Sequence, residues 1–158
     1  MRKYLLLSAV LLSGAAAGAW LMTQAGAETS APPESADLAQ GEKLYQSYCA
    51  SCHGANLEGQ PDWRSPGPDG TLPAPPHDET GHTWHHPDSV LFDYTRLGGK
   101  ATLAAQGVDF ASGMPGFGDQ LRDDQIWNIL AYIKSTWPDR QQQIQAERSA
   151  AESQREGN

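Results

Sequence analysis

Two cysteines and a histidine stand close together in the run Cys49-Ala50-Ser51-Cys52-His53. Two thiols at this spacing can reach the two vinyl groups of one haem, and the imidazole that follows can bind the iron. A structural disulfide or a redox-active C-x-x-C pair would not account for the adjacent histidine. A structural zinc site usually needs four ligands, and the sequence has no second cysteine pair. The motif therefore predicts one covalently bound haem c, attached at Cys49 and Cys52, with His53 as an axial ligand of the iron.

Met114 is expected to be the second axial ligand. The other methionines, Met1 and Met22, lie in the N-terminal segment, so the rest of the chain has Met114 alone. Pro115 favours an extended conformation at Met114, and the neighbouring glycines permit tight turning. A methionine that fills a core is the alternative, although such a residue would more naturally lie on a helix face. A His/Met ligand pair is typical of electron carriers and raises the potential of a haem.

A histidine-rich segment leaves two interpretations open. Four histidines lie close to Trp84, namely His77, His82, His85 and His86. They could form a second metal site, for copper or zinc. The favoured alternative is a loop that packs over a haem edge, where Trp84, His82 and His85 hydrogen-bond the propionates. A further alternative is that one of these histidines, rather than Met114, binds the iron.

Arg64 is the natural partner for a haem propionate, because it is the only basic residue between Lys43 and Arg96. A solvated surface arginine is the equal alternative. Arg64 belongs to a long segment between Gly54 and His86 that is rich in proline and glycine. Such a loop is unusual in a compact domain unless something other than secondary structure organises it, and a large flat cofactor would do so.

Three helices are expected to position these residues. Apolar and small residues recur at intervals of three and four from Asp37 to near Cys49. A second, shorter helix should begin at Pro87 and close at Gly98-Gly99, followed by a loop to Gly118. The last helix should begin near Asp123 and stop before Pro138. Residues 139–158 have almost no apolar side chains, which predicts a polar tail, either a frayed helical extension or disordered.

The N-terminus has the pattern of an export signal. Arg2 and Lys3 precede an apolar run from Tyr4 to Met22, and Ala25-Gly26-Ala27 follows. Residues 1–27 are therefore predicted to be a signal peptide, and 28–36 a flexible linker. An uncleaved anchor that faces the periplasm is the alternative, because the run approaches the roughly 20 residues of a membrane helix. Cleavage would remove two positive charges and change the formal net charge from −8 to −10. That charge disfavours nucleic acid as a partner and favours a redox protein with a basic docking patch.

Taken in order along the chain, these residues resemble the class I c-type cytochromes from about Asp37 to Trp137. The matching features are Gly41 and Tyr45, then Cys49-Ala50-Ser51-Cys52-His53-Gly54, Met114-Pro115-Gly116-Phe117-Gly118, and Leu121 to Ile126 leading to Leu130-Ala131-Tyr132-Ile133. The resemblance implies that the first and last helices cross near Gly41 and Tyr132. It also implies His53 and Met114 as axial ligands, and a proline carbonyl that fixes the ring of His53, for which Pro61, Pro75 and Pro76 are candidates.

One departure from the family pattern concerns the last helix, which usually begins with a Ser or Thr cap. This chain has Arg122 there, so Asp119 or Asp123 is expected to cap the helix instead.

We therefore predict a small all-α domain over residues 37–138, wrapped around one haem. Its expected function is outer-sphere electron transfer by an exported, periplasmic carrier that is not itself an enzyme. Two alternatives stay open. The domain could be the electron-transfer subunit of a larger oxidoreductase, or a ligand-binding or peroxidatic haem protein in which Met114 is weakly held.

Overall fold

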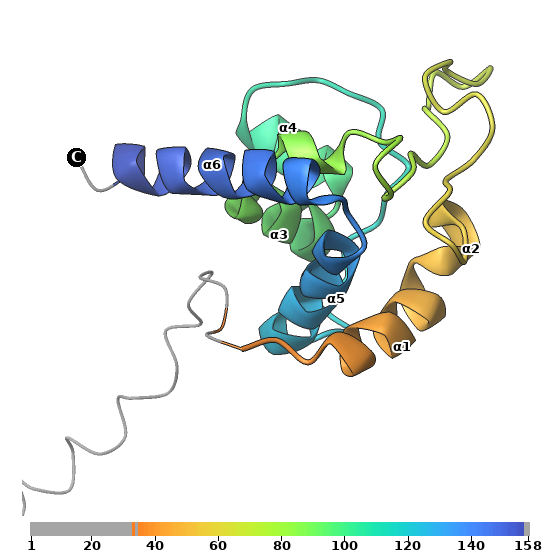
Figure 1. The fold of residues 1–158 in the computed structure, drawn as a ribbon. Coiled ribbons are helices and arrows are strands. Elements are labelled where there is room, and N and C mark those ends of the chain that lie inside the picture. The colour runs from red at the N-terminus through yellow and green to blue at the C-terminus, as the bar shows by residue number, and fades with distance from the viewer. Residues whose placement is uncertain (1–32, 34, 157–158) are drawn as a thin grey trace, which may run out of the picture.

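The computed structural model describes residue 33 and residues 35–156. All regular elements in this part of the chain are helical, which confirms the all-α fold (Figure 1). The elements are α1 (Leu38–Tyr48), α2 (Ala50–His53), the 3-10 helix η1 (Thr83–His85), α3 (Asp88–Leu97), α4 (Gly99–Ala105), α5 (Asp123–Ser135) and α6 (Asp139–Glu156). The predicted signal or anchor, residues 1–27, and most of the predicted linker lie outside the described residues. Within the described ones, no helix is both long enough and apolar enough to span a bilayer.

The three predicted helices correspond to α1, α3 and α5, but α4 was missed. Gly98 ends α3 with a φ of 87°, and the chain enters α4 directly at Gly99 instead of a loop. Residues 100–105 are mostly Ala, Leu and Lys, which have high helix propensity. The glycine pair therefore separates two helices rather than ending the helical region.

Helices α1 and α5 cross in close contact at Gly41. A Cβ atom at this position would lie 2.0 Å from the backbone oxygen of Asn128 and 2.9 Å from the Cβ of Tyr132. The ring of Tyr45 packs against that of Tyr132, with centroids 5.7 Å apart. The side chain of Asn128 accepts a hydrogen bond from the backbone N–H of Asp37 at 2.9 Å. The expected crossing is confirmed, and it fixes α1, whose end carries the cysteine motif.

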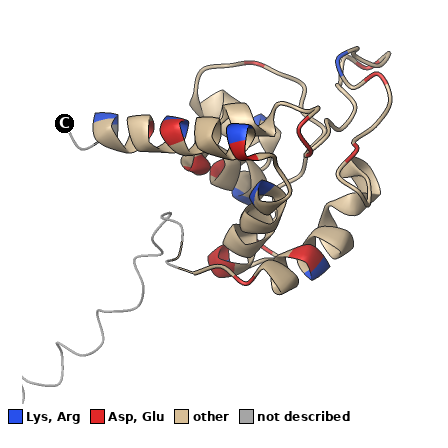
Figure 2. Cartoon of the chain, in the orientation of Figure 1, with Lys and Arg blue, Asp and Glu red and all other residues tan. Residues whose placement is uncertain are grey.

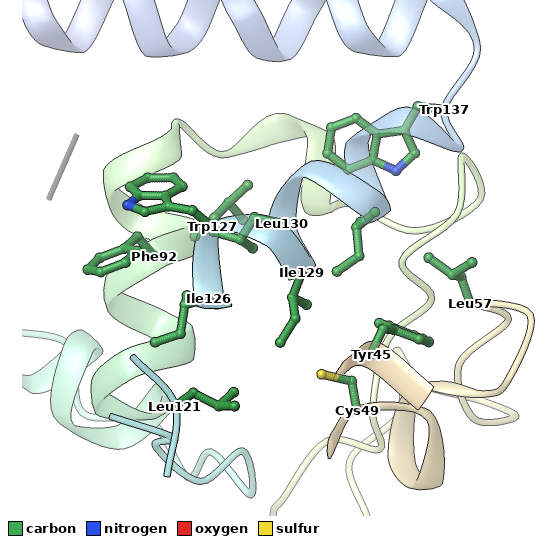
Figure 3. Close-up of a cluster of buried hydrophobic side chains, with 12 residues drawn as sticks. Tyr45, Cys49, Leu57, Phe92, Leu121, Ile126, Trp127, Ile129, Leu130 and Trp137 are labelled. Atoms are coloured by element: carbon green, nitrogen blue, oxygen red, sulfur yellow. The ribbon is translucent and has the colours of Figure 1, made fainter. Parts of the chain in front are cut away.

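The core lies between α1, α3 and α5, as Figure 3 shows. Its buried side chains include Tyr45, Cys49, Leu57, Phe92, Leu121, Ile126, Trp127, Ile129, Leu130 and Trp137. Phe92 of α3 stacks on Trp127 of α5, with ring centroids 4.6 Å apart. Because Cys49 is part of this core, the site is built on the packed interior and not on a mobile surface loop.

The prediction that Asp119 or Asp123 caps α5 was wrong. Arg122 itself occupies the N-cap position, and its side chain makes no cap hydrogen bond. Instead, the backbone N–H of Arg122 donates to the side chain of Gln125 at 3.0 Å, and the backbone N–H of Gln125 donates to the carbonyl of Arg122 at 3.0 Å. Asp123 pairs with Arg96 at 3.2 Å, and this ion pair joins the start of α5 to the end of α3.

The polar C-terminal run is helical over residues 139–156, which agrees with the predicted helical extension and not with the disordered alternative. It forms α6, which lies against η1 and α3 (Figure 1). Gln145 is 1% exposed, and its Nε2 donates to Asp88 Oδ1 at 2.7 Å and to Ser149 Oγ at 3.0 Å. Asp88 also pairs with Lys134 of α5 at 2.7 Å. Buried hydrogen bonds attach α6, so apolar periodicity in the sequence does not reveal its packing against the domain.

Candidate haem site

The cysteine motif is held in one helical turn. Cys49 is the C-cap residue of α1. Its carbonyl accepts hydrogen bonds from the backbone N–H groups of Cys52 and His53, at 3.1 and 2.9 Å. Cys49 is 8% exposed whereas Cys52 is exposed, and both are free thiols. The turn therefore carries two available thiols and one imidazole on a single rigid unit.

The buried thiol of Cys49 stays protonated at ordinary pH. Desolvation, reinforced by the neighbouring Cys52, raises the pKa of Cys49 to about 12. Figure 3 shows its sulfur directed into the apolar cluster. A neutral thiol in such surroundings is a poor metal ligand and a poor disulfide former, because both roles need the thiolate. Its environment fits an apolar reaction partner such as a vinyl group.

The imidazole of His53 is 7% exposed and has a fixed tautomer. Its Nδ1 lies 2.8 Å from the carbonyl oxygen of Pro75, so of the three candidate prolines the structure selects this one. A carbonyl can only accept, so Nδ1 carries the proton and the lone pair is on Nε2. Nothing in the described part of the chain is hydrogen-bonded to Nε2. Burial lowers the pKa of His53, although the bond to Pro75 opposes this effect. A neutral imidazole with Nε2 free has the form that binds a metal.

Tyr45 supports the end of the motif. Its hydroxyl donates to the carbonyl of Gly54 at 2.9 Å, immediately after His53. Burial raises the pKa of this phenol far above its usual value. The hydroxyl therefore stays protonated and keeps donating throughout the ordinary pH range.

Met114 lies partly buried on a loop that packs against the end of α3. Its carbonyl accepts from the N–H of Gly99 at 3.1 Å, and its own N–H lies 3.3 Å from Ser112 Oγ. Further along, the N–H of Phe117 donates to Thr95 at 3.0 Å. A Cβ on Gly116 would lie 2.6 Å from the backbone of Leu97, so glycine permits this close approach. Met114 thus lies outside the helices, but its loop is held by backbone contacts with α3 and α4.

The other predicted contact residues form two stacked groups. Arg64 and His82 both lie against Trp63, the guanidinium 4.0 Å from the ring centroid and the imidazole nearly parallel at 5.4 Å. Trp84 stacks on His85 at 3.6 Å, and its Nε1 donates to the backbone of Glu79. Trp63 was not predicted from the sequence, where its only signal was its position beside Arg64. Propionate contacts from these residues remain a prediction.

A second metal site gains no support from the histidines. Among the described residues, no three His, Cys, Asp or Glu side chains converge as metal ligands would. His82 and His86 lie edge to face, with ring centroids 5.3 Å apart. Contacts between aromatic rings, stacked or edge to face, therefore account for much of the segment's arrangement.

Acid is expected to destabilise the protein through His86. Burial is the main cause that lowers its pKa below the ordinary 6.5, and His82, His85 and Arg148 add repulsion. The unfolded chain therefore protonates His86 more readily than the folded protein does. The free energy of unfolding keeps its full value above pH 6.5 and falls as the pH drops below that value. The melting temperature of the holoprotein should fall between about pH 7.5 and about pH 5. The fall should be smaller in His86→Asn, and an equal fall in both proteins would contradict this origin.

Paired thiols in one turn, together with an imidazole whose Nε2 is free, are what covalent haem attachment requires, so the fold and the site define a haem protein of the c type. The cytochrome c family model matches residues 38–137. The chain belongs to the cytochrome c family. It therefore binds one covalently attached haem c and is an electron-transfer protein.

One curated relative is cytochrome c6 of Diacronema lutheri. It is 27% identical over 99 residues, which cover 63% of this chain and 95% of the relative. No solved structure matches the chain significantly. Helix α6 begins after the last residue of the family match, so it is an addition to the cytochrome c domain.

Proposed function

We propose that this chain is an exported mono-haem carrier, with the haem joined by thioether bonds to Cys49 and Cys52 and its iron bound by His53 Nε2 and the sulfur of Met114. The observation that carries this proposal is the hydrogen bond from His53 Nδ1 to Pro75. It supports a neutral, oriented imidazole that is ready to bind iron. The haem supplies the one-electron couple of its iron.

The protein's own groups keep electron transfer simple. His53 and Met114 stay bound in both oxidation states, so the protein rearranges little between them. Ile126 and Leu130 are buried, and Phe117 packs edge to face on Tyr48 at 6.1 Å. These apolar side chains provide a low-dielectric surrounding that disfavours extra charge and excludes water. No proton donor or nucleophile is needed, and we propose that the domain is not an enzyme by itself.

Export to the periplasm, with cleavage near Ala27, is part of the same proposal. The partner would be a redox protein with a basic patch, since the mature chain would be strongly acidic. Figure 2 shows acidic residues on several helices and loops, mixed with basic ones, so charge alone does not select one docking face. The mass of the protein recovered from the exported fraction would test cleavage.

The covalent attachment is tested by the double variant Cys49→Ser/Cys52→Ser. The wild-type protein should keep its colour in acidified acetone and give the pyridine haemochrome spectrum of a haem with two thioether bonds. The variant should release all its pigment, because no sulfur is left to hold it. Ser51→Ala, in the same turn, is the matched control and should behave as wild type. A colourless exported wild-type protein, or one that loses its pigment into acetone, would refute the proposal.

A further inference from the structure

The ring of His53 is covered on one face by a second histidine. The imidazole of His77 stacks on it, with ring centroids 4.0 Å apart and planes inclined by 25°. His53 is thus held at one edge by Pro75 and on one face by His77. A hydrogen bond at one ring atom leaves the ring free to tilt, whereas a flat neighbour on its face restricts that motion.

His77 is itself fixed from several directions. Its Nδ1 lies 2.9 Å from Thr83 Oγ1, and its backbone N–H donates to Leu57 at 2.8 Å. Its carbonyl accepts from the indole N–H of Trp137 at 2.7 Å. Trp137 is 3% exposed and stands between α5 and α6, so it is anchored in the core. These bonds give His77 the rigidity that a support needs.

We propose that His77 is a positioning residue for the axial imidazole and sets the orientation of the His53 ring plane over the haem. The inference rests on the proposed function, because it requires His53 to bind the iron. His77 acts through His53 and touches the iron ligand, not the iron. The plane of an axial imidazole determines how unpaired spin spreads over a ferric haem, so a change of plane is visible in the haem methyl resonances.

The test uses the ferric holoprotein, three test variants and one control variant, compared by proton NMR. His77→Leu removes the flat ring and should change the order or the spread of the haem methyl resonances. His77→Phe keeps a flat ring and should restore most of the wild-type pattern. Thr83→Val, which leaves the ring but removes its hydrogen bond, should give a smaller change in the same direction. Glu79→Gln, an exposed neighbour in the loop, is the control and should leave the pattern unaltered.

The outcomes separate this inference from the proposed function. If His53→Ala keeps a six-coordinate spectrum, His53 is not the ligand and the proposed function fails. If His53→Ala loses that spectrum while folded His77→Leu retains the wild-type methyl pattern, only the positioning role is overturned. Should His77→Leu not fold, an unchanged pattern in Thr83→Val would overturn it equally. A merely structural role would lower the melting temperature without moving the resonances.

Discussion

Replacing Met114 with alanine is expected to abolish the sulfur-to-iron absorption at the red edge of the ferric spectrum and to lower the reduction potential. The thioether stabilises the ferrous state, and alanine offers no ligand in its place. The fall should be on the order of 100 mV or more, within the span of about 0.8 V that axial ligands cover. Visible spectroscopy and potentiometric titration would measure both effects. The reduced variant should also bind carbon monoxide, because one position on the iron is open.

Val108→Ala is the matched control for this experiment. Val108 is exposed and lies near Met114 in the chain, outside the site, so its loss should leave the absorption and the potential unchanged. A Met114→Ala protein that keeps the wild-type spectrum would mean that another residue binds the iron. Carbon monoxide binding by the reduced wild-type protein at neutral pH would instead favour a ligand-binding haem protein.

Gly41→Ala is expected to cause a large loss of stability. The new Cβ would fall 2.0 Å from the backbone oxygen of Asn128, and backbone cannot move aside as a flexible side chain can. Separating α1 from α5 should cost about 3 kcal/mol in the free energy of unfolding. For a domain of this size, the melting temperature should fall by about 10 to 20 °C. Circular dichroism of the holoprotein would measure the change.

The control for this substitution is Gly67→Ala in the long loop. A Cβ there would meet only the flexible end of Asp69 and the carbonyl of Thr71, at 3.3 and 3.5 Å. Its effect should stay within about 1 kcal/mol. If the two substitutions were equally mild, the close approach of α1 and α5 would not be a feature of the folded protein.

Local patterns allowed the haem motif and three helices to be predicted from the sequence. Cys49 and His53 are four residues apart, so any helical turn brings them together. Choosing among Pro61, Pro75 and Pro76 was not possible, because the carbonyl that reaches His53 depends on how the loop returns to the core. The stacking of His77 on His53 depends on the same return, so the cluster of histidines was seen but its geometry was not.

Where the predictions failed, the structure uses contacts that have no periodic signature. Helix α6 is attached through Gln145 and Asp88, residues that a search for apolar periodicity reads as surface. At the start of α5, no aspartate caps the helix; the side chain of Gln125 accepts the N–H of Arg122 instead. Helix α4 begins at the second glycine of a pair that usually marks the end of a helix. Pairing of polar groups is decided by the tertiary fold, and one sequence contains little information about it.

The crossing of α1 and α5 and the attachment of α6 depend on different forces. The crossing of α1 and α5 buries apolar side chains, whereas α6 is held at Asp88 by hydrogen bonds and lies next to an ion pair. Exposure of apolar surface raises the heat capacity of unfolding and exposure of polar surface lowers it. Detachment of α6 alone should therefore involve little heat-capacity change, and opening of the core a large one. Cooling weakens the apolar core more than the hydrogen bonds that hold α6, so the relative strength of these two sets of contacts depends on temperature.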